Sequence, residues 1–570
     1  MKASILVFAL LGTLAGCARP APSAPPPEKI TGNDIQCRQG LVVSISALAS
    51  ETGRDILAEG GNAVDAAVAT ALALCVTYPA AGNIGGGGFM LVHPAPGQGG
   101  PVVFNYREAA PAAATRDMFG PQDSQYEHKA VAVPGTVRGL AAAHARFGRL
   151  PWARLVAPAV KLAREGFAID TWLAFSLNKY LADKNTPGHD EFLRVFGRPG
   201  GGDWRQGDKL VQPDLARTLE TLGREGPESF YSGSIARQLL AEMRRGGGLL
   251  SAADLAAYRC AVVQPLHTKY RGRFDVYLPP PPSGGGLCLL EMLNTVQNFE
   301  LKSWGRWDLR TLQVMAEAMR RANCDRARFL GDPDFVRIPP ELATPEHGRK
   351  LAAEIDLAKA TPSQDLAPGV FISDGQDTTH FSIIDKDGLA VSNTYTIERL
   401  WGSRIVVKDA GFLLNNNMFG FNVKPGGVDA QGKIGTEPNT IAPGKRPLSS
   451  QSPCIVSEKG RVRLVIGSPG SRAIPATLLG ILVNVLDFDM PVSEAVRAPR
   501  MSHEWHPDAL VVENIDSFPH VEQLRKMGHK VVPKDGIPTQ GDAHCLEATT
   551  SGYRGAADLR RNPDAAAAGY

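Results

Sequence analysis

The stretch DTTHFS at residues 377–382 decides how this chain folds. Residues 379–384 alternate between polar and apolar side chains, DKDG at 385–388 is typical of a hairpin turn, and residues 389–396 have the pattern of a returning strand. Thr378 is therefore expected at the start of a β-hairpin. Taken alone, this says little about chemistry, because Thr-Thr pairs open strands in many proteins.

Thr378 gains a chemical role if the peptide bond between Asp377 and Thr378 is cleaved. A threonine hydroxyl is a weak nucleophile, but a free α-amine on the same residue, whose pKa is ordinarily about 7.7–8.0, can take its proton at neutral pH. One cleavage would thus create both the nucleophile and its base.

Helices and strands are mixed along the rest of the chain, without the alternation of a doubly wound sheet, so the predicted fold class is α+β. Asn62 is a good N-cap for an apolar, buried helix. Helices are expected at residues 47–78 with a break at Gly60-Gly61, and at 152–165, 172–184, 212–224, 235–245 and 309–328. Strands are expected at residues 102–106, 274–278, 380–384, 389–396 and 464–466.

The composition fits one large soluble enzyme. The chain has 570 residues, of which 43% are hydrophobic and 21% charged, and no long low-complexity linker divides it. The net charge of +3 is nearly balanced and no basic run tracks a phosphate backbone, so nucleic acid is not expected as a partner.

The first residues have the pattern of an export signal. A charged start, an apolar stretch at residues 5–14 and Cys17 resemble a bacterial lipobox, in which Cys17 is lipidated. The apolar stretch is shorter than the roughly 20 residues that span a bilayer. Residues 1–17 are thus predicted as a lipoprotein signal and residues 18–35 as a proline-rich tether. Ala18 favours the outer membrane of a Gram-negative cell envelope; the alternative is an ordinary cleaved signal with an incidental cysteine.

Four further blocks carry a family resemblance: EGGNAVDAAV at 59–68, NIGGGGFM at 83–90, KRPLSS at 445–450 and GSPG at 467–470. In this order, with the Thr378 segment between them, they closely resemble the γ-glutamyltranspeptidase (glutathione hydrolase) family. The resemblance runs from about Gln36 to Tyr570. It implies the four-layer αββα sandwich of N-terminal nucleophile hydrolases.

The resemblance also implies maturation of a precursor. The chain would cut itself between Asp377 and Thr378, giving a large subunit of residues 36–377 and a small subunit of residues 378–570 that stay interlocked. Residues 361–376 are expected to form a flexible loop that exposes the cleaved bond.

Catalytic roles follow from the family motifs. Thr378 would attack the γ-amide carbon of a γ-glutamyl compound such as glutathione, and water or an amino acid would then take the acyl group. Thr396 matches the threonine that supports the nucleophile. The backbone amides of Gly470 and Ser471 match the oxyanion hole, although this chain has one glycine where the family often has two.

Substrate-binding roles come from the same resemblance. Arg107 matches the arginine that clamps the substrate α-carboxylate, and Ser449 and Ser450 match the serine pair that binds the same group. At the α-amino end this chain departs from the family. Glu398 replaces a common Asn, Asn417 replaces Gln or Glu, and Gly420 replaces a carboxylate.

Two outcomes are open for this end of the pocket. Glu398 could supply the missing negative charge, or the pocket could prefer an acyl group without the amine, such as glutaryl. Residues 424–446 are about long enough for the lid loop of bacterial relatives but lack an aromatic tip, which favours hydrolysis over transpeptidation.

No cofactor or metal is expected from the sequence. Besides Cys17, seven dispersed cysteines form no Cys-x-x-Cys pair, the histidines lack metal-ligand spacing, and His380 is expected to be a strand residue beside the nucleophile. Three hypotheses remain: a lipid-anchored γ-glutamyltransferase and hydrolase, a cephalosporin or glutaryl acylase on the same scaffold, and an unprocessed envelope protein that only binds γ-glutamyl compounds.

Overall fold

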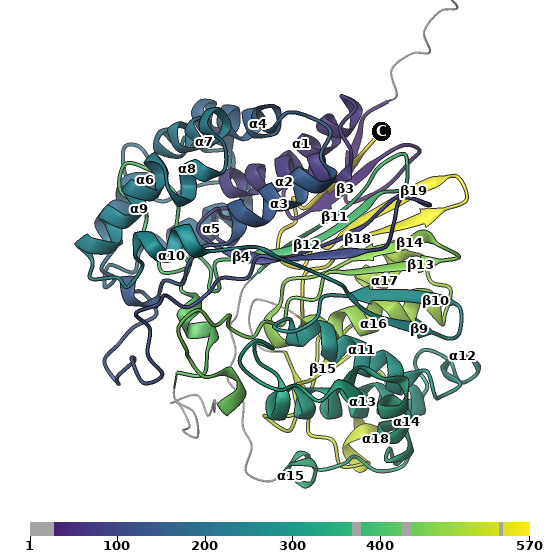
Figure 1. Ribbon diagram of the computed structural model, residues 1–570. Helices are drawn as coiled ribbons and strands as arrows, with labels where there is room; N and C mark the ends of the chain where they lie inside the picture. The colour runs from purple at the N-terminus through teal and green to yellow at the C-terminus, as the bar shows by residue number, and fades with distance from the viewer. Residues whose placement is uncertain (1–27, 368–377, 424–435, 535–539) are drawn as a thin grey trace, which may run out of the picture.

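Two stacked antiparallel sheets form the middle of the fold, and helices cover both outer faces (Figure 1). The computed structural model describes residues 28–367, 378–423, 436–534 and 540–570. The first sheet has eight strands in the order β1 (Ile30–Gly32), β20 (Ala566–Gly569), β3 (Leu41–Ser44), β11 (Thr379–Ile384), β12 (Ala390–Thr396), β4 (Gly87–His93), β5 (Val102–Asn105) and β8 (Ala261–Val263). The second has seven, in the order β2 (Asp34–Cys37), β19 (Gly552–Ala557), β18 (His544–Thr549), β14 (Arg461–Ile466), β13 (Cys454–Glu458), β10 (Phe274–Leu278) and β9 (Leu266–Tyr270).

Strand β4 shows how the layers are built. It is buried along its whole length, and successive side chains point to opposite faces of the sheet. Phe89 and Leu91 belong to the apolar core between the two sheets, whereas Met90 and Val92 belong to the core under the first helical layer. A strand buried on both faces explains why its sequence is a continuous apolar run, and the predicted four-layer αββα sandwich is confirmed.

The first helical layer packs on the eight-stranded sheet. Asn62 caps α2 as expected: its side chain accepts hydrogen bonds from the backbone of Val64 and Asp65, and Asp65 completes a capping box. The helices of the first half of the chain are α1 (Ala47–Ala58), α2 (Ala63–Thr77), α3 (Thr136–Phe147), α4 (Trp152–Glu165), α5 (Thr171–Leu181), α6 (His189–Phe196), α7 (Pro213–Glu225), α8 (Glu228–Tyr231), α9 (Ser234–Arg245) and α10 (Ala252–Ala257). A short pair, β6 (Phe167–Ala168) and β7 (Lys209–Leu210), lies among them in the sequence.

The second helical layer packs on the seven-stranded sheet, where α11 lies against β9 and β10 and α17 lies against β18 and β19, while α13 and α16 pack on α11. Its helices are α11 (Gly284–Val296), α12 (Leu301–Trp304), α13 (Leu309–Phe329), α14 (Pro345–Ala353), α15 (Ser363–Leu366), α16 (Ile474–Leu486), α17 (Val492–Arg497) and α18 (Val521–Lys526). A small sheet of β15 (Met501–His503), β16 (Leu510–Val512) and β17 (Val531–Pro533) joins this layer.

Strands from both sides of residue 378 alternate in the sheets. In the first sheet β11 and β12 lie between β3 and β4, and in the second sheet β13 pairs with β10. Each half of the chain therefore supplies strands that the other half must pair with. A cut at residue 378 would leave two interlocked pieces, as the sequence predicts.

The predicted β-hairpin is present. Asp385 closes its turn by accepting hydrogen bonds from the backbone of Asp387 and Leu389, at 2.9 and 3.1 Å, and Gly388 adopts φ of +87°, which glycine tolerates. Thr379 pairs with Tyr395 across the two strands. The same register sets Thr378 opposite Thr396.

Several predicted boundaries need correction. The strands begin at Ile30, where β1 pairs with β20, and β2 follows at Asp34, so the chain enters both sheets before the predicted end of the tether at residue 35. The helix expected at 172–184 ends at Leu181, and the strand expected at 464–466 starts at Arg461. Part of the expected loop at 361–376 is helical, because Trp505 and Asp508 anchor the start of α15 through hydrogen bonds to the backbone of Ser363.

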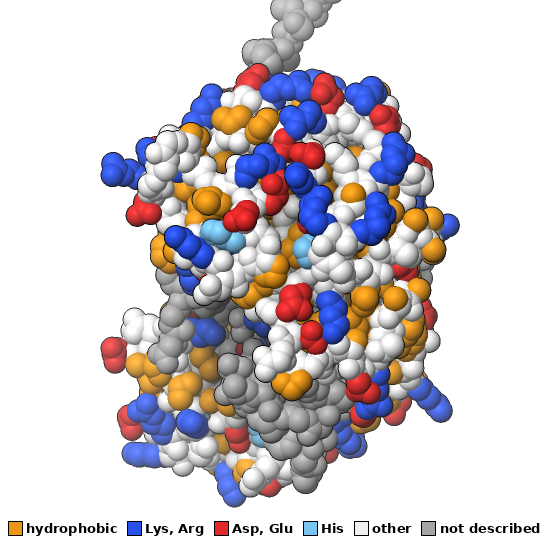
Figure 2. Space-filling view, turned by 90° about the vertical axis from the view of Figure 1, so that its left-hand side faces the viewer, with side chains coloured by type: hydrophobic (Ala, Val, Ile, Leu, Met, Phe, Trp, Pro, Cys, Tyr) orange, Lys and Arg blue, Asp and Glu red, His pale blue; other side chains and the backbone are white. Residues whose placement is uncertain are grey.

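Some predictions lie outside the described residues: the signal segment with Cys17, residue Asp377 and most of the predicted lid. Within the part of the chain that is described, no helix is both long and apolar enough to cross a bilayer. The seven cysteines found there are free thiols. Figure 2 shows positive and negative side chains interspersed over one face, in keeping with the nearly balanced net charge.

Candidate active site

One pocket collects nearly all of the predicted site residues. Of the nine residues predicted to be catalytic or substrate-binding, Gly470 and Asn417 are the two that do not line it. The pocket is lined by Arg107, Thr378, Thr396, Glu398, Leu448, Ser449, Ser450, Gln451, Ser471 and Ile474. These residues come from segments that lie more than 350 positions apart at the extremes, so the fold alone brings them together.

Thr378 sits where the hairpin meets this pocket. It directly precedes β11, its exposed fraction is 6%, and Thr396 at the end of β12 faces it. Thr396 Oγ1 accepts a hydrogen bond of 2.8 Å from the backbone amide of Glu398, which fixes the chain where it leaves the strand. The hairpin thus holds the two threonines side by side on rigid strands.

His380 does not take part in this pocket. Its Nδ1 is 2.8 Å from Thr394 Oγ1 and its Nε2 is 3.0 Å from Ser382 Oγ, so both ring nitrogens are engaged inside the sheets. Complete burial holds the pKa of this imidazole well below its usual value. His380 is a strand residue, as the sequence predicts, and its imidazole is neutral in the core, so the base for Thr378 must come from elsewhere.

A tight backbone turn lies beside Thr378. Gly470 has φ of +136° and Ser471 has φ of +58°, and the chain then enters a short 3-10 turn (Ser471–Ala473) that leads into α16. A Cβ at Gly470 would lie 2.8 Å from the Cα of Gly541, so glycine is needed here. The positive end of the α16 dipole and a strained turn suit this segment to stabilise negative charge.

The serine pair is held from behind by the second helical layer. The backbone of Ser449 bonds to Pro282 and Gly285, at 2.8 and 3.0 Å, just where α11 begins. Ser450 Oγ accepts a hydrogen bond of 3.3 Å from Arg326 on α13. Both serines are thereby fixed at the edge of the pocket, and Arg326 is a supporting residue that the sequence did not reveal.

Arg107 lies between two buried carboxylates. Its Nη1 is 3.2 Å from Glu108 Oε2 and its Nη2 is 3.2 Å from Glu398 Oε2, while Nε donates to the carbonyl of Pro447. The guanidinium is thus oriented in a planar fork, as recognition of a carboxylate requires. The sequence foresaw Arg107 and Glu398 as site residues but not their ion pair.

Glu108 is the main residue that sequence reasoning missed. It is fully buried, and loss of hydration raises its pKa to about 7, although Arg107 and a hydrogen bond from Asn417 act in the opposite direction. Asn417 therefore does not line the pocket as predicted. It stands behind Glu108, with its Nδ2 2.6 Å from Glu108 Oε1. The one sequence signal for Glu108 is its place directly after Arg107.

Gly420 faces the same cluster. A Cβ built at this position lies 3.3 Å from Arg107 Nη2 and 3.1 Å from Asn417 Oδ1. A carboxylate at this position would therefore reach Arg107. Here, the negative charge next to Arg107 comes from Glu398 instead.

Comparisons with known proteins agree with this geometry. The γ-glutamyltranspeptidase family model matches residues 49–568. The chain is 41% identical to the glutathione hydrolase proenzyme of Escherichia coli (strain K12), over 99% of this chain and 98% of that protein. It is 35% identical to the acylase ACY 1 proenzyme of Pseudomonas sp. (strain SE83), covering 87% of each.

A solved structure shares the whole architecture. The cephalosporin acylase from Bacillus halodurans superposes with a TM-score of 0.80 at 26% identity, covering 95% of this chain and 98% of that one. The match in sequence extends over nearly the full length and includes the segments that build the pocket. This chain therefore belongs to the γ-glutamyltranspeptidase family and is an enzyme of that kind.

Proposed function

We propose that this protein hydrolyses and transfers the γ-glutamyl group of glutathione and related compounds through an acyl-enzyme on Thr378. The observation that carries the proposal is the shared pocket of Thr378, Arg107 and the serine pair, which puts a potential nucleophile within the same cavity as groups that bind a carboxylate. Relatives named glutathione hydrolase proenzyme support the substrate class.

Maturation comes first in this account. Thr378 Oγ attacks the carbonyl carbon of Asp377, the C–N bond breaks, and an ester joins the two residues while the α-amine of Thr378 is freed. Water then hydrolyses the ester, leaving a carboxylate on Asp377 and a free hydroxyl on Thr378. The interlocked strands β3, β11, β12 and β4 keep the two pieces together afterwards.

Catalysis then uses the new N-terminus. The α-amine of Thr378 takes the hydroxyl proton as Oγ attacks the γ-amide carbon, and the amides of Gly470 and Ser471 stabilise the oxyanion, each by roughly 2.7–4 kcal/mol. The proton passes to the departing amine as the C–N bond breaks. Water or the amine of an amino acid then attacks the acyl-enzyme and releases the γ-glutamyl group.

Charge determines how the substrate is held. Arg107, Ser449 and Ser450 bind the α-carboxylate, and Glu398 binds the α-ammonium in place of the carboxylate that position 420 lacks. For this to happen, the Glu398 carboxylate gives up part of its ion pair with Arg107 and pairs with the substrate ammonium. The substrate carboxylate replaces it on the guanidinium.

Acylase activity is a second candidate, favoured by two observations. Gly420 brings no carboxylate to the pocket, and acylase ACY 1 is among the relatives. If Glu398 keeps its ion pair with Arg107, its carboxylate is not available to bind a substrate ammonium. A glutaryl group, which lacks the amine, would then be the better substrate.

We also propose that the mature protein is tethered to the cell envelope through lipid on Cys17, facing the periplasm. The support is the sequence alone: a charged start, a short apolar stretch and a cysteine followed by a proline-rich segment. The first strand in the described part of the chain is β1, which starts at Ile30, so a tether ending before it would leave the enzyme outside the bilayer.

Rapid mixing with a chromogenic γ-glutamyl anilide tests the proposed reaction. An acyl-enzyme predicts a burst of released aniline, equal to the enzyme concentration at most, before the steady state. Thr378→Val should abolish the burst and turnover. Thr379→Val is the matched control, because Thr379 Oγ1 has no hydrogen-bond partner among the described residues, and it should keep both. Equal activity of the two variants would refute the role of Thr378.

A further inference from the structure

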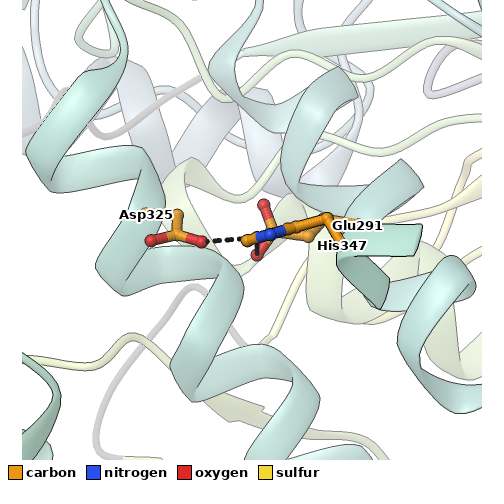
Figure 3. A group of neighbouring side chains, drawn as sticks. All are labelled: Glu291, Asp325 and His347. Atoms are coloured by element: carbon orange, nitrogen blue, oxygen red, sulfur yellow. Dashed lines mark hydrogen bonds and ion pairs between the residues drawn. The ribbon is translucent and has the colours of Figure 1, made fainter. Parts of the chain in front are cut away.

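A second cluster of polar side chains lies in the helical layer behind the serine pair. Glu291 on α11, Asp325 on α13 and His347 on α14 point toward one another from three helices (Figure 3). His347 Nε2 is 2.9 Å from Asp325 Oδ2 and 3.8 Å from Glu291 Oε1. One ligand atom from each residue lies within 4.8 Å of the other two.

Glu291 contacts Asp325 and His347, but one of its carboxyl oxygens lacks a hydrogen-bond partner among the residues that the structure describes. Its exposed fraction is 2%, and its Oε1 has no hydrogen-bond partner in the described part of the chain. Burying a carboxyl oxygen without a hydrogen bond is costly. His347 Nε2, at 3.8 Å, is too far from this oxygen to form one. The nearby Arg328 pairs with Asp325 instead: its Nη1 lies 3.6 Å from Oδ1 of Asp325, whereas His347 contacts Oδ2 of the same carboxylate.

We propose that Glu291, Asp325 and His347 bind one divalent transition-metal ion, with Zn²⁺ as the best fit. An imidazole nitrogen and two carboxylate oxygens are ordinary zinc ligands, whereas Ca²⁺ and Mg²⁺ take oxygen ligands. Bonds of about 2.1 Å in a tetrahedron set ligand atoms roughly 3.4 Å apart. The distances of 2.9 and 3.8 Å from His347 Nε2 lie on either side of that value.

The site has an entry path. Asp325 and His347 line a surface cavity of about 300 Å³, together with Arg328, Glu341 and Leu366. This cavity gives an ion access from solvent and leaves room for a water molecule as the fourth ligand. Three protein ligands from three helices are enough to hold the ion.

Its role would be structural. α11 begins where Gly285 bonds to Ser449, and Arg326, the neighbour of Asp325 on α13, bonds to Ser450. An ion that joins α11, α13 and α14 would therefore brace the helices on which the serine pair rests. Because the ligands do not line the pocket of Thr378, the ion would not enter the reaction.

Metal titration of the processed protein, without a polyhistidine tag and stripped by a chelator, tests this proposal. Calorimetry with Zn²⁺ should give one site per chain, and Co²⁺ should produce visible absorption bands of tetrahedral coordination. His347→Gln and Glu291→Gln should each weaken binding by at least roughly 10- to 100-fold. Zn²⁺ should raise the melting temperature of the wild type and not of these variants.

His267→Gln is the matched control. His267 Nε2 lies 3.0 Å from Asp275 Oδ1, a similar His–Asp pair on the surface, but no third ligand completes it among the described residues. This variant should bind Zn²⁺ like the wild type. If Glu291→Gln does not fold, His347→Gln decides alone, since His347 is partly exposed. A wild type that takes up no ion, or a His347→Gln variant that binds equally well, overturns the site.

Discussion

Arg107 Nη2 lies 3.2 Å from Glu398 Oε2, and both side chains are buried in the pocket of Thr378. Glu108 contacts the same guanidinium from the other side. When both carboxylates are ionised, the cluster holds one negative charge in excess. A substrate with an α-carboxylate and an α-ammonium can exchange partners with this cluster without leaving a charge unpaired.

Glu398→Gln tests whether Glu398 binds the ammonium. The variant should lower kcat/KM for a γ-glutamyl anilide, and the activation free energy derived from this ratio should rise by roughly 1–3 kcal/mol. This is the usual cost of losing a charged hydrogen bond. Glutaryl anilide, which keeps the carboxylate but lacks the amine, is the control and should be affected far less. If wild type already prefers glutaryl anilide and both substrates change equally, the acylase account replaces the γ-glutamyl one.

Gly420→Asp should move specificity toward γ-glutamyl substrates. The new Cβ would lie 3.3 Å from Arg107 Nη2, so the added carboxylate can form an ion pair with this guanidinium. Glu398 is then available to bind the substrate ammonium. The measured quantity is the ratio of kcat/KM for γ-glutamyl and glutaryl anilides, which should rise by about tenfold, near 1.4 kcal/mol. An unchanged or lower ratio would show that position 420 does not contribute to recognition of the amine.

Glu108→Gln should change how stability depends on pH. The native pKa of Glu108 is raised from 4.5 to about 7, so the folded state holds its proton more tightly than the unfolded state. The stabilisation of the folded state by this bound proton is fully present below about pH 4.5 and is lost as the pH rises through about 7. Between pH 4.5 and pH 8, the free energy of unfolding of Glu108→Gln should therefore rise by up to roughly 3 kcal/mol relative to that of wild type.

Thermal unfolding at both pH values measures this difference. Glu522→Gln is the control, since this carboxylate on α18 has 73% of its side chain exposed. It should show no comparable change relative to wild type. A Glu108→Gln variant that tracks wild type at both pH values would mean that Glu108 is not protonated in the folded state at low pH.

Cys17→Ser tests the membrane anchor. Wild type should partition into membrane or detergent fractions, because acyl chains bury many methylenes at about 0.8 kcal/mol each. Cys17→Ser should be soluble or retain its leader. Cys37→Ser provides a second comparison, as Cys37 lies in β2 within the fold, and it should partition like wild type. Equal partitioning of the Cys17 variant and wild type would disprove the anchor.

Local patterns made much of the fold predictable. The turn at Asp385 sets the hairpin register, so the pairing of the strands next to Thr378 and ending at Thr396 could be predicted from the sequence. The cap at Asn62 likewise set the start of α2. Boundaries failed where tertiary contacts decide: β1 exists because β20 pairs with it from the far end of the chain, and the start of α15 is held by Trp505.

Contacts between distant segments could not be predicted from the sequence. Arg107 and Glu398 are 291 positions apart, and a charged residue such as Glu108 is usually exposed, so nothing local predicted that both carboxylates would share one guanidinium. Sequence spacing could not indicate the proposed metal site for the same reason. Glu291, Asp325 and His347 lie on three helices, and only packing of those helices brings them together.

The intact mass of the denatured protein tests the central claim, that Thr378 becomes an N-terminal nucleophile. We expect two fragments, the smaller one spanning residues 378–570, and after rapid quenching with substrate a γ-glutamyl group on Thr378 itself. Thr378→Ala should remain one inactive chain. A single uncut chain in the active wild type, cleavage of Thr378→Ala at the same bond, or an acyl group on another residue would contradict the account.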